Sequence, residues 1–255
     1  MAGNSKMWIG TGWKMNKMLS EAEAFAQTIR DVQAPANIQR FVIPPFTCLR
    51  EVKSLLADTD VMVGAQNMHW QNDGAWTGEI SAPMLVDCQA DLVELGHSER
   101  RTHFAETDHD IGLKVEAALN HGLIPLICIG ETRDQRDAGQ ASNTLKHQVS
   151  GSLERVLHHV ARDRIVFAYE PVWAIGDQGE AASAEYANTR QQEIAQLARE
   201  LLGASVPCLY GGSVNAENCE QLIVCEYIDG LFIGRAAWDA LGYLDIIERC
   251  ARALD

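Results

Sequence analysis

The feature that most constrains the fold is a regular alternation of short apolar runs with longer segments of helical pattern. Eight such runs occur in 255 residues, and each is flanked by polar or Gly-rich turns. Most are apolar on successive residues, which is typical of strands that are covered on both faces. We therefore predict eight strands, at residues 8–12, 40–43, 61–65, 92–95, 124–128, 165–169, 207–210 and 230–233.

The segments between these runs predict helices. Ser20 and Glu23 are spaced as a capping box for a helix over residues 20–32, and Ser183 precedes a helix over residues 183–202. Strand and helix repeated eight times predict an α/β fold, either a closed eight-stranded parallel (β/α)8 barrel or an open doubly wound sheet. No GxGxxG follows the first run, which disfavours the dinucleotide-binding open sheet. The barrel is the favoured prediction, as a single catalytic domain over residues 1–255, because no linker or low-complexity tract interrupts the pattern.

The charge balance limits the possible partners. Lys and Arg number 21 against 35 Asp and Glu, a formal net charge of −14, so we expect no nucleic acid partner and no membrane partner. No apolar run is long enough to span a bilayer. Seven scattered cysteines without a CxxC pair predict neither a disulfide framework nor a zinc site. With a polar start that does not resemble a signal peptide, the expected location is the cytoplasm.

In a barrel, catalytic residues lie at the carboxyl ends of the strands, and three suitable side chains follow predicted strands. Lys14 could hold an anion or stabilise charge on a substrate oxygen. His97 stands at an apparent helix start, where the helix dipole favours a neutral imidazole that donates a hydrogen bond. Glu170 follows a strongly apolar strand, and partial desolvation would make it a better base for removing a proton from carbon.

Two further features suggest how a substrate is enclosed and held. Residues 171–183 combine a proline, an apolar middle and the glycines Gly176 and Gly179, a pattern that indicates a closing lid. Gly211 to Ser213 and Gly234 follow the seventh and eighth predicted strands, where bare backbone amides commonly bind phosphate.

Several stretches, in this order along nearly the whole chain, closely resemble the triosephosphate isomerase family. These are Trp13-Lys-Met-Asn16, Val63-Gly-Ala-Gln-Asn67, Gly74-Ala-Trp-Thr-Gly-Glu-Ile-Ser81, Gly96-His-Ser-Glu-Arg-Arg101, Cys128-Ile-Gly-Glu131, Ala168-Tyr-Glu-Pro-Val-Trp-Ala-Ile-Gly176 and Tyr210-Gly-Gly-Ser-Val214.

The resemblance implies a TIM barrel that interconverts aldose and ketose phosphates with no cofactor and no metal. It implies that Glu170 is the catalytic base, His97 the electrophile and Lys14 the cation that steadies the enediolate. The loop from Gln66 to Gly78, with Thr77 at its tip, resembles the arm by which one subunit of a homodimer reaches the other. Supporting and phosphate-binding roles are implied for Ser98, Glu99, Gly176, Ser213 and Gly234.

The chain departs from the family pattern at three substrate contacts. Gly12 stands where the family usually has Asn, residues 176–180 replace a lid ending in Gly-Thr-Gly-Lys, and Gly234-Arg235 replaces Gly-Gly. These changes spare the proton-transfer residues and predict a changed substrate. Loss of the Asn side chain would enlarge the site, and Arg235 would add charge for a phosphate or contact an added hydroxyl.

The favoured function is therefore an isomerase of a small phosphorylated sugar, with L-erythrulose 1-phosphate as substrate. The main alternative is ordinary triose-phosphate isomerisation. Two other hypotheses are a barrel that binds a sugar phosphate without converting it and a phosphosugar aldolase. The first does not need a base such as Glu170, and the second requires a Schiff-base lysine, for which Lys14 is the only candidate at a strand end.

Overall fold

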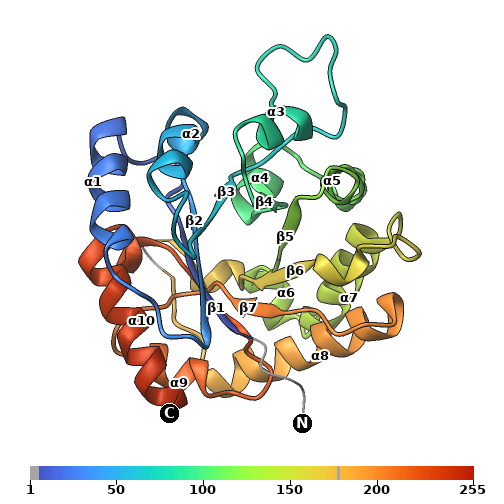
Figure 1. Cartoon of the computed structure of the whole chain (residues 1–255). Coiled ribbons are helices and arrows are strands. Elements are labelled where there is room, and N and C mark those ends of the chain that lie inside the picture. Colours follow the sequence, from blue (N-terminus) through green and yellow to red (C-terminus); the bar gives the residue numbers. More distant parts are fainter. Residues whose placement is uncertain (1–5, 177–178) are drawn as a thin grey trace.

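A closed barrel of eight parallel strands forms the centre of the molecule. The computed structural model describes residues 6–176 and 179–255. Its strands are ordered β1 to β8 around the barrel, and β1 pairs in parallel with both β2 and β8. Helices surround the strands (Figure 1). The predicted α/β barrel is confirmed, and the open doubly wound sheet is excluded because the first and last strands are hydrogen-bonded to each other.

Each predicted strand is present, with ends that move by no more than two residues. The largest shift is in the second strand, which begins at Ile38 rather than at residue 40. The strands are β1 Met7–Gly12, β2 Ile38–Ile43, β3 Met62–Ala65, β4 Leu92–Leu95, β5 Ile124–Ile129, β6 Val166–Tyr169, β7 Cys208–Tyr210 and β8 Gly230–Ile233.

The helices mostly follow the strands as predicted, with one error at the first. Here the helix is capped at Met18, whose backbone N–H donates to Glu21, so Ser20 lies inside the helix and the predicted Ser20–Glu23 box is wrong. The Ser183 cap is confirmed by its bond from the Tyr186 amide. The helices are α1 Leu19–Arg30, α2 Phe46–Leu55, α3 Ala82–Asp87, α4 Ser98–His103, α5 Asp108–Asn120, α6 Arg133–Asp137, α7 Ala141–Leu153, α8 Ala184–Leu202, α9 Cys219–Ile223 and α10 Ala240–Leu254, with short 3-10 turns η1 Arg162–Arg164, η2 Val172–Ala174 and η3 Arg235–Ala237.

The core has two parts because successive side chains of a strand point to opposite faces. The larger part lies between the strands and the helices. The smaller part fills the barrel interior with residues from alternate strand positions, namely Phe41, Ile43, Leu92, Leu126, Cys128, Val166, Ala168, Leu209 and Phe232. Since Leu92 faces the interior, Glu94 two residues further along β4 faces it as well.

A long loop after β3 projects from the body of the barrel (Figure 1). It returns to the barrel where the His69 amide donates to the Ile80 carbonyl at 2.7 Å. His69 stacks on Trp70, with ring centroids 4.2 Å apart, and packs at a tilt against Trp76, with ring centroids 4.3 Å apart. In the described part of the chain, no helix has the length and apolar character needed to cross a bilayer.

Candidate active site

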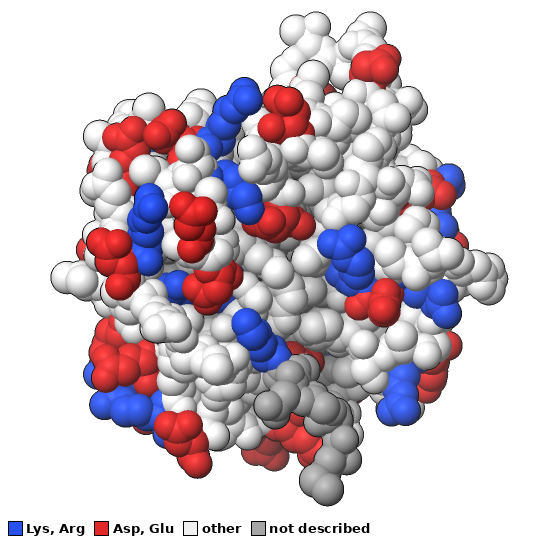
Figure 2. Space-filling model, in the orientation of Figure 1, with Lys and Arg blue, Asp and Glu red and all other residues white. Residues whose placement is uncertain are grey.

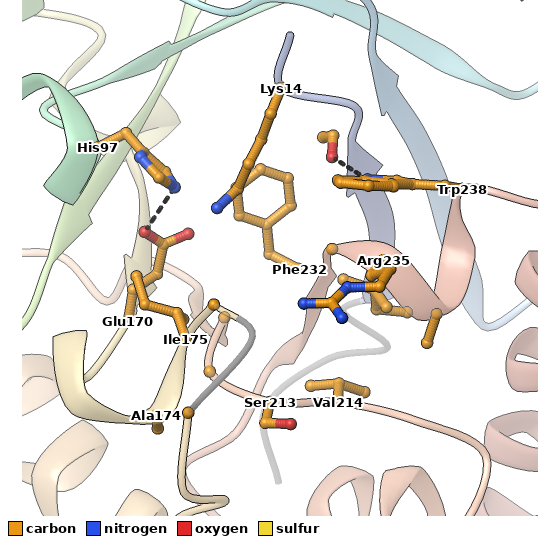
Figure 3. A pocket seen from close by; sticks show the side chains of 18 of the residues that line it. Lys14, His97, Glu170, Ala174, Ile175, Ser213, Val214, Phe232, Arg235 and Trp238 are labelled. Atoms are coloured by element: carbon orange, nitrogen blue, oxygen red, sulfur yellow. Dashed lines mark hydrogen bonds and ion pairs between the residues drawn. The ribbon is translucent and has the colours of Figure 1, made fainter. Parts of the chain in front are cut away.

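One cavity of about 890 Å³ opens at the carboxyl ends of the strands. This is the end at which barrels of this architecture carry their catalytic groups. The predicted base, histidine and lysine all line it, although β1, β4 and β6 supply them from distant parts of the sequence (Figure 3). The structure therefore brings together Lys14, His97 and Glu170 as the sequence predicted.

Glu170 follows β6 directly and is almost completely buried. Glycines on the neighbouring segments make room for it, since a Cβ at Gly211 would come within 2.7 Å of the Glu170 Cγ. A Cβ at Gly130 would clash with the Glu170 carbonyl oxygen. Burial raises the pKa of Glu170 to about 7, partly opposed by the positive charge of Lys14. A carboxyl with this pKa is a suitable general base near neutral pH.

The His97 ring is held in one orientation by the start of α4. Its Nδ1 accepts a hydrogen bond from the Glu99 amide at 3.1 Å, so Nδ1 carries no proton. The proton of the neutral ring is then on Nε2, which lies 3.4 Å from Glu170 Oε2 (Figure 3). His97 is thus arranged to donate a hydrogen bond into the cavity.

Lys14 extends into the cavity from the loop after β1 (Figure 3). Its backbone has φ 51°, a left-handed conformation that costs a non-glycine residue on the order of 1 kcal/mol. The side-chain amide of Gln66 holds this loop by donating to the Lys14 carbonyl at 2.8 Å. Nζ lies 2.7 Å from Glu99 Oε1. Burial lowers the pKa of Lys14, but the bond and charge of Glu99 outweigh it, so the pKa is raised.

The predicted phosphate-binding residues line the opposite side of the same cavity. Gly176, Ser213, Gly234 and Arg235 are all among its lining residues. The Arg235 side chain extends into the cavity, on the side away from His97 (Figure 3). Of the predicted site residues, all of which the structure describes, only Ser98 does not line the cavity. Ser98 is buried, and its hydroxyl has no hydrogen-bond partner among the described residues.

The first part of the predicted lid is anchored to the barrel by Glu131. This buried carboxylate accepts hydrogen bonds from Trp173 Nε1 at 2.8 Å and from the Tyr186 and Tyr169 hydroxyls. At the far end, Glu180 pairs with Arg133 of α6 at 3.2 Å. The acidic lid residue that replaces the family's lysine therefore contacts a helix of the barrel, whereas Asp177 and Gln178 lie outside the described residues.

Among the cavity residues that the sequence did not predict are Glu94, Phe232 and Trp238. Trp238 Nε1 donates to the Gly12 carbonyl at 2.9 Å. The Phe232 ring lies 3.0 Å from the place that a Cβ at Gly12 would take, so this ring fills part of the space expected from loss of the Asn side chain. The signal for Glu94 was available, because it is a charged residue within the apolar run of β4.

Glu94, Cys128 and Glu170 each place a potential ligand atom within 4.8 Å of the others. Burial raises the pKa of the Cys128 thiol well above its usual value and that of Glu94 to about 8. Both groups therefore keep their protons at neutral pH, whereas metal ligands bind in their deprotonated forms. A metal ion could bind here only by displacing these protons.

The surface charge agrees with a small ligand rather than a polyanion. On the face shown in Figure 2, Lys and Arg side chains are interspersed with Asp and Glu, and no continuous basic area is visible. Positive charge for an anion is available inside the cavity instead, from Lys14 and Arg235.

The fold and the arrangement of carboxylate, histidine and lysine around one cavity define a (β/α)8-barrel isomerase. Residues 7–250 match the family model described as "Triosephosphate isomerase". The chain belongs to the triosephosphate isomerase family.

Similar curated proteins are named L-erythrulose-1-phosphate isomerase. The one from Rhizobium rhizogenes strain K84 is 59% identical over 257 residues, covering 100% of this chain and 98% of that protein. The one from Brucella abortus biovar 1 is 60% identical over 249 residues, covering 97% of each. The one from Rhizobium meliloti is 58% identical over 252 residues, covering 98% of this chain and 99% of that protein.

Proposed function

We propose that this chain isomerises L-erythrulose 1-phosphate, as a single catalytic domain over residues 1–255 that uses no cofactor and no metal. The observation that carries the proposal is Glu170, a buried carboxyl with a pKa of about 7 that faces the cavity beside His97 and Lys14. Binding alone would not need a base. The names of the similar curated proteins favour the tetrulose phosphate over the triose phosphates.

The chemistry follows from the structure of this substrate. L-erythrulose 1-phosphate has its phosphate on C1, its carbonyl at C2, and a hydroxyl and a hydroxymethyl group on C3. Glu170 takes the proton from C3, and the electron pair moves to the C2 oxygen to give an enediolate. A proton then passes from the C3 oxygen to the C2 oxygen, and return of a proton to C2 completes the move of the carbonyl to C3. With a triose phosphate the same transfer interconverts an aldose and a ketose.

His97 and Lys14 stabilise the negative charge that forms on oxygen. The Nε2–H of His97 donates to the substrate oxygens, and the Lys14 ammonium lies on the same side of the cavity (Figure 3). In comparable enzymes, removing one fixed donor from a site that excludes water raises the activation free energy by about 3 kcal/mol. Glu99 positions Lys14 through the 2.7 Å ion pair.

The phosphate is held on the opposite side of the cavity. Arg235 supplies charge, Gly234 immediately precedes the η3 turn, and Gly176 and Ser213 lie close by as further backbone donors. Backbone amides at such turns and helix starts bind phosphate well. Ser98 follows His97 at the start of α4, on the other side of the cavity, and supports the His97 loop.

We further propose a homodimer that joins through the loop from Gln66 to Gly78. Large apolar side chains are exposed on the loop and on elements beside it, which is unusual for a monomer. They include Met15 at 96% exposure, with Phe46, Trp76, Met84, Val86 and Phe104. Several of these come from α2 and α3, which lie next to the projecting loop in Figure 1.

We propose a cytoplasmic location as well. All seven cysteines are free thiols. Reduced cysteines are typical of a reducing compartment.

The experiment is a comparison of kcat/KM for L-erythrulose 1-phosphate and for glyceraldehyde 3-phosphate. We expect the tetrulose phosphate to be preferred, and a preference for the triose phosphate would contradict the proposed substrate. Glu170→Gln should lower kcat by about 10²- to 10⁴-fold while the substrate still binds. Glu248→Gln, an exposed carboxyl on α10, is the matched control and should leave kcat unchanged. Full activity in Glu170→Gln would overturn the role of the base.

A further inference from the structure

Glu94 is a buried carboxyl in the cavity that the proposed proton transfer does not use. It occupies an interior position of β4 and is only 6% exposed. Its neighbours in the barrel interior are apolar, including Leu92, Leu126 and Phe232. Burying a carboxyl among such groups costs several kcal/mol unless it finds polar partners. The fold alone gives no reason for an acid here.

The protein partners of Glu94 do not offset this cost. Among the described residues, its one hydrogen bond is accepted by Oε1 from the Cys128 thiol at 3.7 Å, and thiols are weak donors. Lys14 is more than an ion-pair distance away and contributes only through its charge. The second oxygen, Oε2, faces the space above Gly12, because a Cβ at that position would be 3.7 Å from it. Glu94 thus presents an unused oxygen to the cavity.

The Glu94 carboxyl lies beside the reacting centre. The ligand atoms of Glu94 and Glu170 are within 4.8 Å of each other, so Glu94 is close to the carbon that Glu170 deprotonates. The proposed substrate differs from dihydroxyacetone phosphate by one hydroxymethyl group, and that group is attached to this same carbon. Its hydroxyl is two bonds away from the carbon, within reach of a side chain that flanks the base.

We propose that Glu94 determines substrate specificity by hydrogen-bonding the hydroxymethyl group that a tetrulose phosphate carries on its reacting carbon. The inference rests on the proposed function, which it extends from a substrate to the residue that selects it. Gly12 leaves the Glu94 carboxyl uncovered, and the Phe232 ring closes the apolar side of this subsite. A carboxyl that keeps its proton offers both a donor and an acceptor to a hydroxyl. A triose phosphate leaves the subsite unfilled.

The effect on specificity follows from the cost of an unpaired group. A site built to hydrogen-bond a hydroxyl discriminates strongly against the analogue that lacks it, since the buried polar group is then left without a partner. Replacing Glu94 by Leu removes this partner at similar volume. Replacing it by Gln keeps a donor and an acceptor in the same place.

The test measures kcat/KM for L-erythrulose 1-phosphate and dihydroxyacetone phosphate in wild type, Glu94→Leu and Glu94→Gln. We expect Glu94→Leu to lower the tetrulose value about 10- to 100-fold and to leave the triose value within a few-fold of wild type. Glu94→Gln should retain most of the tetrulose preference. Rescue by Gln distinguishes a hydrogen bond from a merely structural role.

The outcomes separate this inference from the proposed function. If wild type prefers the tetrulose phosphate but Glu94→Leu changes both substrates equally, or neither, the proposed function stands and the role of Glu94 is overturned. If wild type prefers the triose phosphate, the proposed substrate is wrong. The inference then survives only if Glu94→Leu still lowers the ratio of tetrulose to triose activity, and an unchanged ratio overturns both.

Discussion

Replacing Glu94 by Gln should stabilise the protein by an amount that grows with pH. The pKa of Glu94 is raised by burial from 4.5 to about 8. Between these values the folded state holds a proton that the unfolded state has lost, so the free energy of unfolding falls as pH rises. The stability that depends on protonated Glu94 is fully present below pH 4.5 and is lost as the pH rises through about 8. A Gln at position 94 has no such dependence.

The magnitude follows from the size of the shift. At ~1.4 kcal/mol per pKa unit, a rise from 4.5 to about 8 corresponds to about 5 kcal/mol when the carboxyl is fully ionised. Glu170 is close enough to titrate together with Glu94, so the titration belongs to the pair. The groups that act on Glu94 are Lys14, Cys128, Glu99, Arg100 and Glu170.

The assay is urea unfolding of wild type and Glu94→Gln between pH 5 and pH 9 at one protein concentration. The variant should match wild type within about 1 kcal/mol at pH 5 and exceed it by about 5 kcal/mol at pH 9. Glu248→Gln, which removes an exposed carboxyl of α10, controls for the loss of one charge. A difference between Glu94→Gln and wild type that stays constant across this range would refute the buried, protonated carboxyl.

Three further predictions concern the base, the phosphate and the assembly. kcat/KM should rise with pH through about 7 as Glu170 loses its proton, and a profile flat from pH 6 to pH 8 would contradict its role as base. Arg235→Ala should raise KM roughly tenfold with little change in kcat, because a charge-assisted bond to phosphate is lost; unchanged kinetics would exclude this contact. Light scattering should give the mass of two 28.1 kDa chains, and the mass of one would refute the dimer.

Much of the fold could be predicted because the strands are buried on both faces and therefore stand out as apolar runs. The closure of the barrel could not be predicted in the same way, because an open sheet has the same alternation of strands and helices. The pairing of β1 with β8 distinguishes the two. The predicted cap of α1 was wrong. Ser20 and Glu23 have the spacing of a capping box, but in the structure the Met18 amide donates to Glu21 and the helix begins one residue before Ser20.

The catalytic residues were predictable because each follows an apolar strand within two residues, at the mouth of the barrel. Glu94 was missed although a charged residue stands out in the apolar run of β4, because sequence alone does not show which face of a strand a residue occupies. Phe232 was missed for the same reason, and its position changes the interpretation of Gly12. A side chain at this position would press against the ring, and the glycine also leaves the Glu94 carboxyl facing the cavity.

In the proposed mechanism, Glu170 moves a proton between neighbouring carbons of L-erythrulose 1-phosphate. Proton NMR of this substrate with the enzyme in D₂O follows that transfer. We expect deuterium to appear on a carbon as the carbonyl moves from C2 to C3, and Glu170→Gln to show neither change on the same time scale. A wild-type enzyme that binds the sugar phosphate but leaves its carbonyl in place and its carbon-bound protons unexchanged would rule this mechanism out.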